Sequence, residues 1–191
     1  RQTDGGDLSG VTALFDAFKL TSIGTLDLSN CGLGPGSVGK FAECLSEATP
    51  FTAAVTELTI SDNPGIIGTV EYGRCETLDA HLDGFQQLCD AMQSSNLNKL
   101  SLSNIGMGPK ACGMFSALLG SATSFTAAVT QLNLDSNGIF GKLPDWQGRG
   151  AEPDKFAAQS EPFFAALKDS QITALSLKGT GMGPASAQKL A

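Results

Sequence analysis

The chain repeats one short pattern five times, and this repetition limits its possible folds more than any other feature. The pattern is L-x-x-L-x-L-x-x-N-x-L, with Cys, Ile or Thr in place of Asn in alternate copies. The copies begin at residues 23, 55, 97, 129 and 172, so the true unit is a pair of copies about 74 residues long. A fixed period predicts an array in which each unit buries its apolar face against its neighbours. We expect a single array over residues 1–191, with a partial repeat at 1–22 and truncation at both ends.

Each copy predicts a short strand with one buried face. In the first copy, Leu26 and Leu28 alternate with polar residues, which is the periodicity of a half-buried strand. At the ninth position of their copies, the amides of Asn63 and Asn137 are suited to satisfy buried backbone groups where the strand ends. We assign a structural role to the five residues at this position: Cys31, Asn63, Ile105, Asn137 and Thr180.

The segments that follow the strands predict helices. Gly-Pro pairs recur at residues 34–35, 108–109 and 183–184, and Pro is favourable in the first turn of a helix. Further helical stretches follow Asp7, Asp79 and Asp154, and an Asp at such a place is a candidate N-cap for the helix after it.

The repeated pattern resembles the leucine-rich repeat, and the resemblance covers nearly the whole chain. The alternation of Asn with other residues is similar to the ribonuclease-inhibitor-like subclass. The sequence Asn-Gly-Ile-Phe-Gly-Lys-Leu-Pro at residues 137–144 is similar to the plant type. The resemblance implies an α/β leucine-rich-repeat solenoid, a right-handed βα superhelix with a parallel sheet on the concave face and helices on the convex face. It also implies binding through the outward strand side chains.

Those outward side chains are the first candidate binding surface, which we call the strand face. It consists of Asp27, Thr59, Ser101, Asn133 and Ser176, then Ser29, Ser61, Ser103, Asp135 and Lys178, then Asn30, Asp62, Asn104 and Ser136. The strand face lacks the Trp, Tyr and Arg residues that usually dominate protein hot spots. It therefore favours a protein with a flat polar surface or a polar or carbohydrate ligand. The alternative is that these are merely solvated strand residues.

Two long segments, at residues 64–79 and 140–155, are the second candidate surface. They contain the aromatic residues Tyr72, Phe140 and Trp146, which we expect to be exposed. Insertions of this length in a repeat array tend to collect on one face, which is often the binding face.

Composition excludes several classes of function. The net charge of −7, with no cluster of Lys or Arg, argues against nucleic acid as a partner. No apolar stretch approaches the roughly 18 residues that a membrane span needs, so we expect no membrane insertion. The only His is His81, and no metal-ligand or nucleophile motif is present, so we predict no catalytic residues, no metal and no cofactor. Calcium binding by carboxylates of the long segments is a minor alternative.

Four of the five Cys residues occupy positions that are mostly apolar in sister copies, which predicts free buried thiols. Cys75 is the exception, because it lies in a long segment and is able to pair or react. The cysteines favour a reducing compartment and the low charge favours the outside, so localisation stays open.

These observations predict a non-catalytic scaffold that recognises a protein or a ligand through the strand face and the long segments. The alternative is a structural protein whose copies assemble end to end or side by side into a filament or surface layer.

Overall fold

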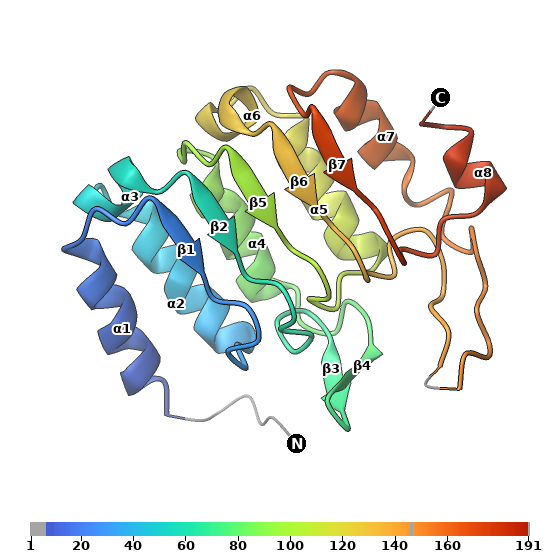
Figure 1. The fold of residues 1–191 in the computed structure, drawn as a ribbon, viewed down its shortest axis with the longest axis horizontal. Coiled ribbons are helices and arrows are strands. Elements are labelled where there is room, and N and C mark those ends of the chain that lie inside the picture. The colour runs from blue at the N-terminus through green and yellow to red at the C-terminus, as the bar shows by residue number, and fades with distance from the viewer. Residues whose placement is uncertain (1–6, 146, 191) are drawn as a thin grey trace.

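Five three-residue strands form one parallel sheet at the centre of the computed structural model, which describes residues 7–145 and 147–190 (Figure 1). The strands are β1 (Thr25–Asp27), β2 (Glu57–Thr59), β5 (Lys99–Ser101), β6 (Gln131–Asn133) and β7 (Ala174–Ser176), and they lie in this order across the sheet. Each strand therefore pairs with the strand of the next copy along the chain.

The register of the sheet places the repeated leucines side by side. Leu26 pairs with Leu58, which pairs with Leu100, and the row continues through Leu132 to Leu175. The backbone ladder extends past the strands, since the N–H of Leu28 donates to the carbonyl oxygen of Thr59 at 2.8 Å and the same bond recurs at the next three strands. The expected parallel alignment of the five copies is thus confirmed.

The predicted leucine-rich-repeat solenoid, however, is wrong. The described residues contain seven strands, five in the parallel sheet and two in a separate antiparallel pair, β3 (Thr69–Glu71) and β4 (Arg74–Thr77), and they trace no superhelix. The physical reason is that each copy contributes only one very short strand, while the long connection after β2 folds into a hairpin of its own. The architecture is an α/β fold with these two sheets.

Four helices pack together on one face of the parallel sheet (Figure 1). They are α2 (Pro35–Ser46), α4 (Asp83–Met92), α5 (Pro109–Leu119) and α7 (Glu161–Lys168). The remaining helices are α1 (Ser9–Lys19), beside α2, and the short helices α3 (Pro50–Ala54), α6 (Ser124–Ala128) and α8 (Pro184–Ala187). As predicted, α2, α5 and α8 begin with Pro, directly after a Gly in extended conformation.

The core lies between the sheet and these helices. Ile60, Leu102 and Leu134 each directly follow a strand and are fully buried. Phe85 of α4 and Phe115 of α5 belong to the same buried cluster. Burial of such side chains stabilises each by about 1.5–3 kcal/mol, so the repeated apolar positions are the main source of stability.

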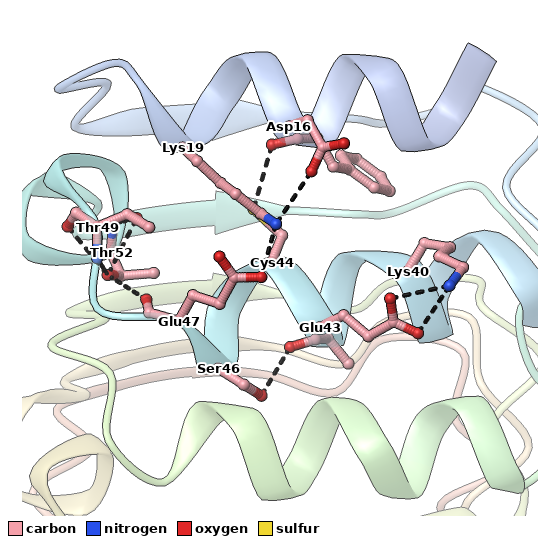
Figure 2. A network of polar contacts seen from close by, with 11 residues as sticks. Asp16, Lys19, Lys40, Glu43, Cys44, Ser46, Glu47, Thr49 and Thr52 are labelled. Carbon is pink, nitrogen blue, oxygen red and sulfur yellow. Dashed lines mark hydrogen bonds and ion pairs between the residues drawn. The ribbon is translucent and has the colours of Figure 1, made fainter. Parts of the chain in front are cut away.

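Polar contacts fasten α1 to α2 at one end of the molecule (Figure 2). The Lys19 ammonium lies 3.0 Å from the Asp16 carboxylate and 2.6 Å from that of Glu47. Glu47 first, and then Asp16, raise the pKa of Lys19. Just beyond, Thr49 and Thr52 form a reciprocal capping box that starts α3. This charged cluster is therefore explained by its role in holding the helices together.

In the part of the chain that the structure describes, no helix has both the length and the apolar character needed to cross a membrane.

Candidate binding surface

Two buried Asn side chains organise the ends of β2 and β6. The Nδ2 of Asn63 donates to the carbonyl oxygens of Leu28 and Ile60, both at 2.9 Å, and its Oδ1 accepts from the N–H of Leu33 at 3.0 Å. Asn137 repeats this arrangement, donating to Leu102 at 2.7 Å and to Leu134 at 3.0 Å. The predicted structural role of both residues is confirmed, because each amide satisfies backbone groups that water does not reach.

The other three residues at the ninth position differ in their surroundings. Ile105 is buried, and Thr180 is buried with its hydroxyl donating to the carbonyl oxygen of Leu177 at 2.7 Å. Cys31 is exposed, so the prediction that it fills a structural, apolar position is wrong. The first long segment covers Ile105, since the N–H of Ile67 donates to its carbonyl oxygen at 3.1 Å. Cys31 lies beside the edge strand β1, where no described segment covers it.

A column of left-handed residues follows the strands. Asn30, Asp62, Asn104 and Ser136 have φ values of 53°, 57°, 51° and 56°. Asn and Asp tolerate this conformation better than other non-Gly residues, so part of their polar character is required by the turn. Their N–H groups continue the sheet ladder, as when Asn30 donates to the carbonyl oxygen of Ser61 at 3.0 Å. We call these four residues the turn column.

Most of the strand face is accessible, but not all of it. The exposed members are Asp27, Asn30, Asp62, Ser136 and Lys178, and the half-buried members are Ser29, Thr59, Ser103, Asn104, Asn133, Asp135 and Ser176. Ser61 and Ser101 are buried, with their hydroxyl oxygens 2.8 Å apart. These two hydroxyls satisfy each other across adjacent strands, so they are not available as first contacts for a ligand.

Several members of the strand face also have tasks inside the fold. The Asp27 carboxylate accepts from the N–H of Ser29 at 2.8 Å, and the hydrogen bonding from Ser29 lowers the pKa of Asp27. The Asp135 carboxylate accepts from the N–H of Lys178 at 2.7 Å.

Sequence reasoning missed one further outward column, at the first residue of each strand. The column consists of Thr25, Glu57, Lys99, Gln131 and Ala174, which pair in register across the sheet. Glu57 and Lys99 face each other with 3.8 Å between carboxylate and ammonium. The signal was present, since each of these residues immediately precedes a Leu that is buried or, at Leu175, partly buried, and must point the other way.

The three aromatic residues that we expect to be exposed on the long segments do not share one outcome. Tyr72 is 96% exposed at the tip of the β3–β4 hairpin. Phe140 is fully buried, with its ring stacked on that of Phe164 at 5.2 Å between centroids, so the prediction that it is an exposed binding residue is wrong. The rings of Phe163 and Phe164 on α7 draw Phe140 into the core. Trp146 lies outside the described residues.

The hairpin and three residues of the turn column line an open hollow of about 420 Å³. Asn30, Asp62 and Asn104 line it from three successive turns, and Val70 and Gly73 line it from the hairpin. The Asn104 Nδ2 donates to the Asp62 Oδ1 at 3.0 Å. We call this space the hairpin hollow; it brings members of both candidate surfaces together.

A second hollow, of about 630 Å³, lies between α2 and α4 and includes His81 in its lining. Its one ammonium group, on Lys40, is held by Glu43 at 2.9 Å. Over residues 7–145 and 147–190, no group of three or more His, Cys, Asp or Glu is arranged to hold a metal ion.

Carboxylates of the long segments act as helix caps, although not where predicted. Asp7, which lies outside these segments, accepts from the N–H of Ser9 at 2.9 Å, but the N-cap residue of α1 is Leu8 rather than Asp7 as predicted. Asp79 instead accepts from the N–H groups of Gly108 (2.8 Å), Lys110 (2.8 Å) and Ala111 (3.1 Å), so it caps α5 rather than α4. The prediction assumed capping by sequence neighbours, whereas packing brings segments about 30 residues apart into contact.

Asp154 does the same for α8, where its carboxylate accepts from the N–H groups of Gly183, Ala185 and Ser186. Ser186 lowers the pKa of Asp154 most, and together with the other N–H groups brings it to about 2. Capping accounts for both carboxylates, so neither needs a calcium ion to explain its position.

All five cysteines are free thiols, and Cys44, Cys89 and Cys112 are buried as predicted. Burial raises the pKa of Cys89 and that of Cys112 to about 12. Burial also raises the pKa of Cys75 to about 11, although this residue is only partly covered. The thiolate is the reactive form, so these groups are poor nucleophiles near neutral pH.

The resemblance to leucine-rich repeats stays a prediction. Comparison of the chain with protein-family models finds no match, and comparison with curated proteins finds none.

Proposed function

We propose that this protein is a non-catalytic binding module that contacts its partner through the accessible part of the strand face and the β3–β4 hairpin. The observation that carries the proposal is the position of Tyr72, almost wholly exposed on a hairpin that borders the turn column. Exposed aromatic residues contribute strongly to recognition, whereas they contribute little to the stability of a free protein.

The chemistry of the strand face supports binding rather than catalysis. A hydrolytic or transfer reaction needs a nucleophile with a nearby base, or a pair of carboxylates with different pKa values. On the strand face, Asp27 and Asp135 accept hydrogen bonds from backbone N–H groups and act there as turn residues. The remaining hydroxyls and amides are suited to hydrogen bonds with a polar surface.

Site-specific photo-cross-linking tests the proposal. We would place a benzoylphenylalanine at Thr59 or at Lys178 on the strand face and, as a matched control, at the exposed Ala117 on α5. Irradiation in the producing cells, followed by intact mass measurement, should show discrete adducts from the two strand-face positions and none from Ala117. Adducts from Ala117 alone, or from no position, would contradict the proposal.

Sedimentation of the purified protein separates this function from assembly into a filament. A binding module sediments as one discrete species over a wide concentration range, whereas non-closing contacts between copies give particles that grow with concentration. Concentration-dependent filaments would overturn the module and favour the structural role.

A further inference from the structure

We infer that the hairpin hollow binds a neutral carbohydrate, with the ring of Tyr72 stacking on one sugar and with Asn30, Asp62 and Asn104 of the turn column holding its hydroxyl groups. This inference rests on the proposed binding function and names its ligand class. Its starting point is a residue whose presence the fold does not explain.

Tyr72 has an unfavourable backbone conformation. It and Gly73 have φ values of 49° and 74° between the paired residues Glu71 and Arg74, which is a type I′ turn. Asn, Asp and Gly are preferred at the first central position, and a bulky residue with positive φ is an outlier. At the other described positions with positive φ, the chain uses only Gly, Asn, Asp or Ser.

The side chain of Tyr72 does not stabilise the folded state. It is 96% exposed, and neither its ring nor its hydroxyl contacts a described residue by a ring contact or hydrogen bond. Backbone strain that the free protein does not use is typical of a functional site. A strained and exposed aromatic ring therefore indicates contact with something outside the chain.

The hollow beside the hairpin indicates what that partner is. Among the residues that the structure describes, its lining contains no Lys or Arg, and Asp62 is its one charged group, so it does not suit a phosphate or carboxylate ligand. It also lacks the deep apolar pocket that would anchor a hydrophobic peptide side chain, since Val70 and Pro64 are its only sizeable apolar residues. With anionic and hydrophobic ligands excluded, the hollow suits a neutral polar ligand.

The polar groups of the hollow match the hydroxyl groups of a sugar. The Asp62 carboxylate offers acceptors, and the Asn30 and Asn104 amides offer both donors and acceptors, so adjacent hydroxyls that donate and accept are satisfied together. The Asn104 amide uses part of this capacity in its hydrogen bond to Asp62. Tyr72 does not line the hollow but directly precedes Gly73, which does, so a pyranose that extends from the hollow to the hairpin turn would stack its C–H face on the Tyr72 ring. About 420 Å³ is a suitable size for a small ligand.

Titration with four neutral hexasaccharides tests the inference: maltohexaose, cellohexaose, mannohexaose and chitohexaose. We would follow amide signals by NMR and affinity by calorimetry. At least one should bind, with shifts concentrated at Asn30, Asp62, Gly73 and Asn104. Binding by none of the four at 10 mM, or shifts concentrated elsewhere, would overturn the inference.

Variants then assign the roles. Tyr72→Phe keeps the ring and should bind within about 3-fold of the parent, whereas Tyr72→Asn should weaken binding at least 10-fold while the fold is kept or stabilised, because Asn suits the turn. Asp62→Asn should weaken binding about 5-fold. The control is Ala117→Ser, at an exposed position on α5 outside the hollow and outside the strand face, which should leave binding unchanged. Full affinity in Tyr72→Asn would exclude the stacking role.

The two proposals fail separately. If no sugar binds but Thr59 and Lys178 still give specific adducts, the chain is a binding module with a different class of ligand. If sugars bind but those two positions give no adduct, the hollow is the site and the wider strand face is not.

Discussion

The first and second long segments, which follow β2 and β6, start alike and then diverge. Each follows a buried Asn with the same hydrogen bonds, and each ends in an Asp that caps a helix of the next copy. Between these anchors, the first segment forms the β3–β4 hairpin, whereas the described part of the second has an antiparallel bridge between Lys142 and Glu152 and a backbone hydrogen bond from Asp145 to Arg149. The fold therefore requires the anchors and leaves the residues between them free to vary.

Both segments also pass close to the next turn of the chain. Gly106 has a φ of 82°, and a Cβ there would strike the backbone of Gly68 in the first segment. Gly181, with a φ of 73°, stands in the same relation to Gly141 in the second. These two close backbone contacts fix each long segment at the same position in its pair of copies. The hairpin of the first segment is therefore built on a backbone contact that both segments share.

The largest difference between the segments should appear at Phe140 and its counterpart Ile67. Both donate a backbone hydrogen bond to the next copy, to Thr180 at 3.0 Å and to Ile105 at 3.1 Å. Phe140→Ala should lower the free energy of unfolding by about 4 kcal/mol and Ile67→Ala by about 3 kcal/mol, because only Phe140 stacks on aromatic rings of α7. Urea denaturation measures both; a smaller loss for Phe140→Ala would contradict the stacking argument.

Asn63→Ala and Asn137→Ala should be equally destabilising, by about 3 kcal/mol each, because each leaves several buried backbone groups without a partner. The control is Asn98→Ala, whose exposed amide bonds the Thr130 hydroxyl at 2.9 Å and should cost about 0.5 kcal/mol or less. Thermal and chemical unfolding check the three variants. Clearly unequal losses of unfolding free energy at positions 63 and 137 would show that the two Asn residues are not equivalent.

The helix caps should differ in effect although their geometry is the same. Asp79→Ala should cost about 1–2 kcal/mol and speed amide exchange at Lys110 and Ala111, because it uncaps the eleven-residue α5. Asp154→Ala should affect only α8, which has four residues. Asp79→Asn keeps an acceptor and should restore part of the loss; if it does not, charge rather than hydrogen bonding is responsible.

The pH dependence of the Asp154 cap follows from its lowered pKa. The folded-state pKa of about 2 lies below the ordinary value of 3.8, so the carboxylate contributes its full effect above pH 4 and loses it as the pH falls through about 2. Amide exchange at Ala185 and Ser186, compared between the parent and Asp154→Ala, should converge only near pH 2.

Thiol labelling gives the smallest effect and reports directly on the hairpin. In a Cys31→Ser background at pH 8, Cys75 should react at least about 100-fold more slowly than an exposed thiol, because its pKa is raised and it is partly covered. Glu152→Cys places a thiol at the exposed bridge of the second segment and should label quickly. Equal rates at positions 75 and 152 would show that the hairpin opens as readily as the second segment.

The extent to which the sequence predicts the fold and the candidate site differs from residue to residue. The leucine pattern predicted the parallel alignment, because alternating apolar residues at a fixed period have one way of sharing a core. The same pattern led to the solenoid, which is wrong, because a period does not determine how far successive units rotate. Tyr72 was chosen correctly as an exposed residue and Phe140 incorrectly, since both are aromatic residues in a long segment and only α7 distinguishes them.

The sequence alone determined the features that depend on near neighbours. Gly-Pro pairs started three helices, Asn63 and Asn137 ended two strands, and apolar alternation selected the buried face, because propensity and side-chain period act over a few residues. Tertiary structure alone decided that Cys31 is exposed, that Asp79 caps α5, and that the hairpin borders the turn column. Each of these depends on how segments about 30 or more residues apart pack, and no local sequence pattern specifies which segment packs against which.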